Sequence, residues 1–158
     1  MSQNIGAGCL FIQGNFILVG YTPKYKKWSG IGGKIEAKET LRQTAIREMV
    51  EELFGLKPTQ KIINDIDKLL ISSKIIIREN YGILPISFEL YNYISLVLFT
   101  NRCVSPYYKT IPMKFIDLVQ NRIPMDNAEI TELKVVNYTL NNPDIDKNII
   151  ADAYFVSK

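Results

Sequence analysis

Short runs of apolar, β-prone residues mark the predicted strands. Residues 9–12 and 16–21 form two such runs, and Gln13-Gly14-Asn15 between them predicts the turn of a β-hairpin. Farther along the chain, runs rich in branched and aromatic side chains predict three more strands. These strands are expected at residues 74–78, 88–100 and 129–138.

Apolar residues spaced three and four apart predict the helices. The longest predicted helix spans residues 40–54, where Thr40 and Gln43 fit a capping box and Gly55 stands at the end. Strands and helices in this order predict an α/β (α+β) fold, in which a mixed β-sheet is sandwiched between helices in one domain over residues 1–158. Shorter helices are expected at residues 64–70, 112–122 and 144–155, the last introduced by Asn142 and Pro143.

Composition and charge fit an ordinary folded protein. The length of 158 residues suits one core, and 47% hydrophobic with 22% charged residues is typical of soluble domains. The net charge of +3 is too small to indicate a polyanionic partner by itself. No basic, apolar leader is visible and no apolar run approaches the roughly 20 residues of a membrane span, so a cytoplasmic location without membrane contact is expected. Cys9 and Cys103 stand in apolar runs, which predicts buried, reduced thiols.

Histidine is absent from the sequence, and this limits the chemistry. A histidine-ligated zinc site and a Ser-His-Asp triad are both excluded. Any metal must be held by oxygen ligands, which favour hard cations such as Mg²⁺ or Mn²⁺.

The helix predicted at residues 40–54 carries three clustered carboxylates. On a helical wheel Glu48, Glu51 and Glu52 share an arc about 100° wide, and only Arg47 offsets their charge. Their spacing brings them within about 5–6 Å of one another, so a divalent cation would relieve the repulsion. A solvated acidic face is the alternative interpretation. The glycine-dense segment at residues 30–33 favours the cation, because glycine lets the backbone approach a ligand closely.

Residues 33–56 resemble the signature of the Nudix hydrolases. In that family a glycine, five residues, a glutamate and seven residues lead into Arg-Glu-aliphatic-any-Glu-Glu. Gly33, Glu39 and the run Arg47-Glu48-Met49-Val50-Glu51-Glu52 match every one of these positions. One departure follows the last glutamate, where two residues instead of one precede Gly55.

The resemblance implies a role for each matching residue. Arg47 would hold Glu39 or a neighbouring carboxylate, and Glu48 would be a ligand or would position the attacking water. A second, weaker match downstream makes Glu129 the candidate to reach the metal or act as base, with Glu132 as the alternative. An exposed acidic strand end is the competing interpretation of that match. The implied ligands of Mg²⁺ or Mn²⁺ are the carbonyl oxygen of Gly32 and the side chains of Glu48, Glu51 and Glu52.

The segment from Trp28 to Glu36 is similar to the corresponding segment of the oxidised-purine triphosphatases in the same family. The implied reaction is metal-dependent cleavage of a nucleoside triphosphate to the monophosphate and pyrophosphate. Ser29 replaces an asparagine that reads the base in those relatives, so selectivity for oxidised guanine is in doubt. The implied substrate-binding residues are Trp28, Ser29, Gly33 and Lys34.

Two other functions stay open at this point. One is hydrolysis of capped RNA, for which the insertions between residues 57 and 125 and a group of lysines offer a surface. The other is a non-catalytic module that binds a nucleotide, although such modules usually lose the acidic residues retained here. The sequence also leaves open whether the chain works as a monomer or a homodimer. The lysines are Lys24, Lys26, Lys27, Lys34 and Lys38.

Overall fold

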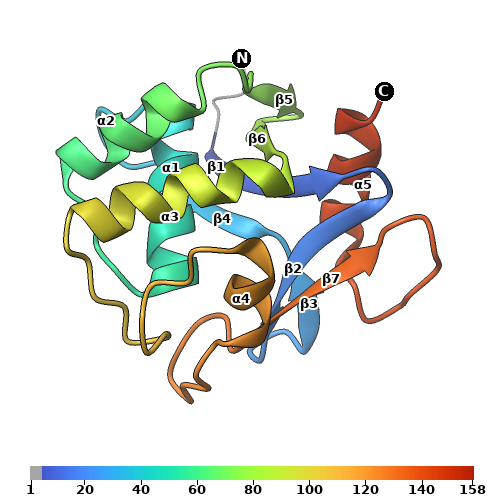
Figure 1. The fold of residues 1–158 in the computed structure, drawn as a ribbon. Helices are drawn as coiled ribbons and strands as arrows, with labels where there is room; N and C mark the ends of the chain where they lie inside the picture. Colours follow the sequence, from blue (N-terminus) through green and yellow to red (C-terminus); the bar gives the residue numbers. More distant parts are fainter. Residues whose placement is uncertain (1–4) are drawn as a thin grey trace.

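The structure, a computed structural model, describes residues 5–158. Seven strands form one mixed sheet (Figure 1). They are β1 (Gly6–Gln13), β2 (Phe16–Thr22), β3 (Lys27–Ser29), β4 (Ile31–Lys34), β5 (Ile76–Arg78), β6 (Tyr81–Ile86) and β7 (Glu132–Asn137).

β1 joins the two halves of the sheet. Its first residues pair antiparallel with β4 and parallel with β6, so that Gly6 lies opposite both Lys34 and Tyr81. Its last two residues, Ile12 and Gln13, pair with β2, which continues the sheet to β3 and β7. Among the described strands β4 pairs only with β1, and it therefore forms an edge of the sheet.

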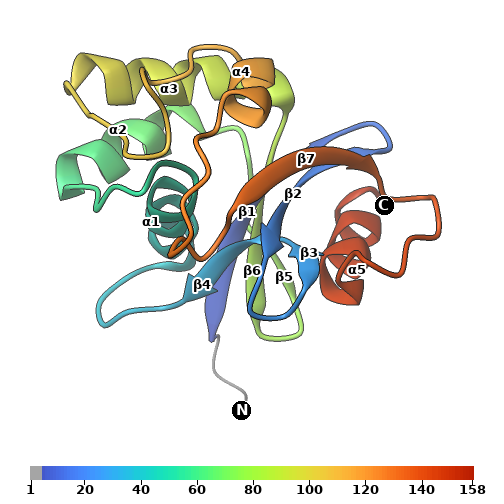
Figure 2. The ribbon, with the colours of Figure 1, turned by 90° about the horizontal axis from the view of Figure 1, so that it is seen from below.

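Helices cover both faces of this sheet (Figure 2). On one side lie α1 (Leu41–Phe54), α2 (Gln60–Leu69), α3 (Tyr91–Thr100) and α4 (Phe115–Gln120), and on the other lies α5 (Lys147–Val156). The predicted mixed sheet flanked by helices is thus confirmed. No helix within residues 5–158 has the length and apolar character needed to cross a bilayer.

Strand alternation creates a separate apolar core on each face. In β1, Cys9 and Phe11 pack in the core beneath α1, while Leu10 between them packs in the core beneath α5. Cys9 is buried and its thiol donates to the carbonyl of Ala45, whereas Cys103 is only partly buried. Both thiols are free, as predicted, and the buried setting is confirmed for Cys9.

Local signals determine both ends of α1. The Thr40 hydroxyl accepts from the N–H of Gln43, and the Gln43 side chain accepts from the N–H of Thr40, which confirms the capping box. Gly55 ends the helix with φ at 64°, a left-handed conformation that glycine adopts without a steric penalty. The register of α1, and hence the direction of its acidic side chains, is set by these ends.

One strand prediction was wrong. Residues 88–100 form a short 3₁₀ turn (Phe88–Leu90) followed by α3. Tyr91, Ile94 and Leu98 are fully buried at a spacing of three and four, so packing of one helical face overrides the β-prone composition. β6 was not predicted, because Pro85 interrupts its apolar run. Pro85 is tolerated because β5 ends its pairing at Ile83, which leaves the last part of β6 free of a neighbour on that side.

Other elements shift relative to their predicted limits. α2 begins at Gln60, earlier than predicted, because the Thr59 hydroxyl caps it. α5 begins only at Lys147, since Asp146 rather than Asn142 caps the helix. β7 begins at Glu132, three residues later than predicted. Glu129 therefore lies in the loop that leads into β7.

Candidate functional site

A buried guanidinium organises the acidic residues of α1. Arg47 Nε lies 2.6 Å from Glu39 Oε2, and its Nη1 lies 2.8 Å from Glu48 Oε1 and 3.2 Å from Glu51 Oε2. Nη2 donates to the carbonyl of Lys34 over 2.9 Å. These carboxylates raise the pKa of Arg47, chiefly through the hydrogen bonds to Glu39, so the group stays charged. One side chain thus fixes three carboxylates and the end of β4.

Glu39 lies in the loop before α1, and its carboxylate accepts hydrogen bonds from three residues. Burial alone would raise the pKa of Glu39, but hydrogen bonds from Arg47, the backbone N–H of Glu36 and the hydroxyl of Thr44 lower it overall. The carboxylate is therefore ionised and fully engaged. Glu39 thereby fixes the position of the Arg47 guanidinium.

Glu52 has no cationic partner among residues 5–158. Its Oε1 accepts the backbone N–H of Gly32 over 2.8 Å, and that hydrogen bond is its contact with the edge of β4. Burial, followed by the negative charge of Glu129, raises the pKa of Glu52 to about 9, with Glu48 and Glu51 adding to the effect. Glu52 is thus a partly buried carboxylate that lies among other carboxylates and has no cationic partner of its own in the described chain.

Glu48 sits directly beneath β4. Burial is the main cause that raises the pKa of Glu48, and the charges of Glu51 and Glu129 act in the same direction. A Cβ added at Gly33 would overlap the Glu48 carboxylate, so any larger residue there would force Glu48 out of its place beneath β4. This explains why a glycine stands at the first position of the motif.

The loop before β7 brings Glu129 near the carboxylates of Glu48 and Glu52. Its charge acts on both Glu48 and Glu52, so these residues lie within electrostatic reach of one another. Glu132 instead lies on β7 opposite Tyr21 and is not among the charges that act on Glu52. We call Glu48, Glu51, Glu52 and Glu129 the acidic cluster.

Arg122, which the sequence analysis did not single out, ties this site together. Its Nη1 donates to the carbonyl of Leu53 over 2.6 Å, and its Nη2 donates to the carbonyls of Glu52 and Ile130 over 2.9 and 3.0 Å. The guanidinium also lies 4.4 Å from the centre of the Tyr107 ring. It joins the C-terminal end of α1 to the loop of Glu129. The sequence contains no local signal for a contact that spans about 70 residues.

The predicted substrate-binding residues divide between two strands. Gly33 and Lys34 end β4 next to Glu48 and Arg47. Trp28 and Ser29 lie on β3, where the Trp28 ring is covered by Lys134 Nζ at 4.0 Å from the ring centre.

The donor set of the acidic cluster suits a hard divalent cation. In the described chain Arg47 donates to one oxygen of Glu48 and one oxygen of Glu51, and the Gly32 N–H donates to one oxygen of Glu52. The second oxygen of each carboxylate accepts no hydrogen bond from the described part of the protein. Within residues 5–158, no three acidic, thiol or imidazole side chains are arranged as a preformed metal site. Carboxylate oxygens and excess negative charge are nonetheless what Mg²⁺ and Mn²⁺ bind. The chemistry of these residues fits such an ion.

Comparison with known proteins agrees with this chemistry. Residues 3–71, which include β4 and α1, match the family model described as the NUDIX domain. A search of curated proteins finds no match. This part of the chain is therefore similar to the NUDIX domain.

Several solved structures described as Nudix hydrolases or pyrophosphatases are similar to this chain in fold. A NUDIX family hydrolase from Clostridium perfringens is 17% identical with a TM-score of 0.47, over 98% of this chain and 96% of that one. A MutT NUDIX hydrolase from Burkholderia pseudomallei is 11% identical with a TM-score of 0.48, over 98% of each chain. An ADP-ribose pyrophosphatase from Streptococcus suis is 12% identical with a TM-score of 0.45, over 99% and 93%.

Proposed function

We propose that this chain is a Mg²⁺- or Mn²⁺-dependent pyrophosphohydrolase that cleaves a nucleoside triphosphate to the monophosphate and pyrophosphate. The observation that carries the proposal is the acidic cluster, in which Arg47 pairs with Glu48 and Glu51 but no cation within residues 5–158 pairs with Glu52. Burial and the neighbouring carboxylates raise the pKa of Glu52 to about 9 because they disfavour its charge. A solvated acidic face would not produce this, since its carboxylates would be exposed and screened.

The proposed ligands are the free oxygens of Glu48, Glu51 and Glu52. A bound divalent ion would neutralise charge on the diphosphate and activate water for attack at phosphorus. Arg47 keeps Glu48 and Glu51 in place through Nη1, while Glu39 holds Arg47 from the opposite side. These contacts orient the ligands before substrate arrives.

Glu129 is the proposed proton acceptor. It lies near Glu48 and Glu52 but is carried by a different segment, so it can face the water from outside the helix. Arg122 links its loop to α1 through the carbonyls of Ile130 and Glu52. The chain's own groups therefore supply ligands, orientation and a base.

The experiment is a substrate panel with Mg²⁺, Mn²⁺ or EDTA. Ordinary and oxidised deoxynucleoside triphosphates, nucleotide sugars, dinucleoside polyphosphates and capped RNA are compared by release of phosphate, pyrophosphate or monophosphate. We expect metal-dependent turnover of triphosphates that is lost in EDTA. Full activity in EDTA, or no hydrolysis of any member with either metal, would overturn the proposal.

A further inference from the structure

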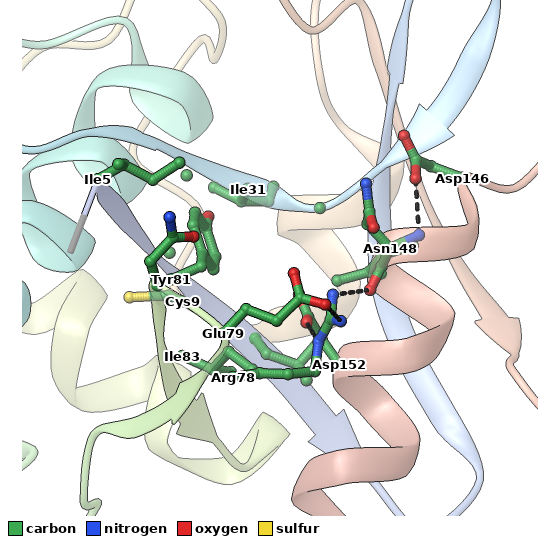
Figure 3. Close-up of a pocket in the computed structure, with 16 residues that line it drawn as sticks. Ile5, Cys9, Ile31, Arg78, Glu79, Tyr81, Ile83, Asp146, Asn148 and Asp152 are labelled. Carbon is green, nitrogen blue, oxygen red and sulfur yellow. Dashed lines mark hydrogen bonds and ion pairs between the residues drawn. The ribbon is translucent and has the colours of Figure 1, made fainter. Parts of the chain in front are cut away.

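Helix α3 differs in charge from the helix on the opposite face of the sheet. α5 is tied to β5 by an ion pair, in which Arg78 Nε lies 2.6 Å from Asp152 Oδ1 and the two side chains point toward one another (Figure 3). In contrast, no residue from Leu90 to Asn101 is acidic or basic, so α3 has no side chain that could form such a pair. A helix that is apolar on nearly all sides is typically buried on all sides.

One side of α3 is nevertheless exposed. Figure 2 shows the helix at the outside of the molecule, on the side away from α5. Its exposed residues lie within an arc about 120° wide, and the large apolar ones among them are spaced three apart. They are Tyr93, Leu96 and Phe99, which are 53%, 48% and 61% exposed. We call these three residues the α3 stripe, and a continuous exposed apolar surface of this kind is typical of an interaction site.

The two ends of the α3 stripe differ in shape. Beside its N-terminal half the surface is hollowed, and the lining of the hollow includes Leu90, Tyr93 and Leu96. At its C-terminal half stands Phe99, which has the largest exposed fraction of the three. A surface with a hollow at one end and a protruding ring at the other can fit a second copy of itself turned by 180°.

The charges at the two ends of the helix have opposite sign. Glu89 precedes α3 and lines the same hollow, Arg102 follows the helix, and both are exposed. Neither residue forms an ion pair within residues 5–158. An antiparallel pair of α3 helices would bring Glu89 of one copy beside Arg102 of the other and would oppose the two helix dipoles. A parallel pair would bring like charges together.

We propose that the protein forms a twofold-symmetric homodimer in which the α3 stripes of two copies pack antiparallel. Leu96 then lies at the twofold axis, because it is midway between Tyr93 and Phe99. Phe99 of each copy enters the hollow beside Tyr93 of the other, which pairs two aromatic rings at each end of the interface. A lipid surface is a poorer match, since α3 carries no lysine or arginine that could meet the headgroups.

The size of the stripe predicts a weak dimer. A standard interface buries about 800 Å² on each partner, and three side chains that are about half exposed offer roughly 300 Å² of it. We therefore expect a dissociation constant on the order of 10–100 µM. The dimer is dissociated at the much lower concentrations of kinetic assays, so changes in the stripe or its flanking charges should leave turnover unchanged. The inference is independent of the proposed function.

Sedimentation equilibrium of the full chain, from about 5 µM to about 500 µM, measures the association. The average mass of wild type should rise toward twice that of the monomer. Leu96→Glu places two carboxylates at the twofold axis and should weaken the dimer at least tenfold. Leu140→Glu is the matched control, because Leu140 is 65% exposed in the loop between β7 and α5, and it should dimerise as wild type does.

Reversal of the flanking charges tests the antiparallel arrangement. Glu89→Arg and Arg102→Glu each bring like charges together across the interface and should weaken the dimer about threefold or more. The variant that carries both changes restores opposite charges and should regain wild-type association. These variants decide the question alone if Leu96→Glu does not fold.

Three results would overturn the proposal. The first is wild type that stays monomeric at about 500 µM, whether or not it binds vesicles of phosphatidylcholine and phosphatidylglycerol. The second is equal dimerisation of wild type and folded Leu96→Glu. The third is a double charge variant that associates no better than the single variants.

Discussion

The backbone N–H of Gly32 donates a 2.8 Å hydrogen bond to Oε1 of Glu52, which joins the edge strand β4 to the acidic face of α1. The next residue, Gly33, lies against the Glu48 carboxylate. Two successive peptide units of β4 are thereby placed against two acidic side chains of α1. The glycine at position 33 therefore leaves room for the Glu48 carboxylate against the strand.

Gly33→Ala tests this close approach. The added Cβ would overlap the Glu48 carboxylate, so Glu48 must move and turnover should fall by one to two orders of magnitude, about 1.5–3 kcal/mol in activation free energy. Steady-state kinetics with Mg²⁺ measures this.

Gly14→Ala provides the comparison, because Gly14 has φ at 58° and no atom within 4 Å of an added Cβ. It should cost about 1–2 kcal/mol of stability through backbone strain and leave turnover unchanged. Wild-type turnover in Gly33→Ala would contradict the packing of β4 on α1.

Arg122→Ala should loosen the link between α1 and the loop of Glu129. Three carbonyls lose a charged donor, so we expect a loss of about 2–4 kcal/mol in unfolding free energy and a larger fall in kcat than in substrate affinity. Denaturant unfolding and kinetics measure the two effects.

Arg102→Ala is the control for Arg122, because Arg102 is exposed and has no side-chain hydrogen bond within the described chain. It should be nearly neutral in both measurements. If both arginine variants behave alike, Arg122 does not position the Glu129 loop.

Glu52→Gln should stabilise the metal-free protein in a pH-dependent manner. The pKa of Glu52 rises from an ordinary 4.5 to about 9, so at neutral pH the unfolded chain is ionised while the folded chain retains the proton. Wild-type stability is thus penalised increasingly as pH rises above about 4.5, and the penalty is absent at lower pH.

Thermal unfolding in EDTA checks this sign. Glu52→Gln should exceed wild type by about 1–3 kcal/mol near pH 7 and match it near pH 4. The exposed Glu89→Gln should show no such difference. A stability gain confined to acidic pH would contradict the burial and charge crowding of Glu52.

The sequence predicted α1 and its two ends well because the signals there are local. The Thr40 cap, the Gly55 end and the acidic spacing all lie within one helix, and Arg47 holds Glu39 as expected. Residues 88–100 were predicted as a strand because their composition favours β structure. They form mainly a helix because one helical face packs into the core, and that packing involves residues far away in the sequence. Arg122 and the Arg78–Asp152 pair depend on contacts across about 70 residues, which no spacing along the chain reveals.

The most direct test of the central claim compares kcat for triphosphate hydrolysis in wild type, Glu52→Gln and Glu89→Gln at saturating Mg²⁺. Glu52→Gln keeps the size of the side chain and its contact with Gly32 but removes a ligand charge. The acidic cluster as a metal site predicts a loss of at least about a hundredfold in Glu52→Gln, with wild-type activity in Glu89→Gln and none in EDTA. Wild-type kcat in folded Glu52→Gln would contradict it.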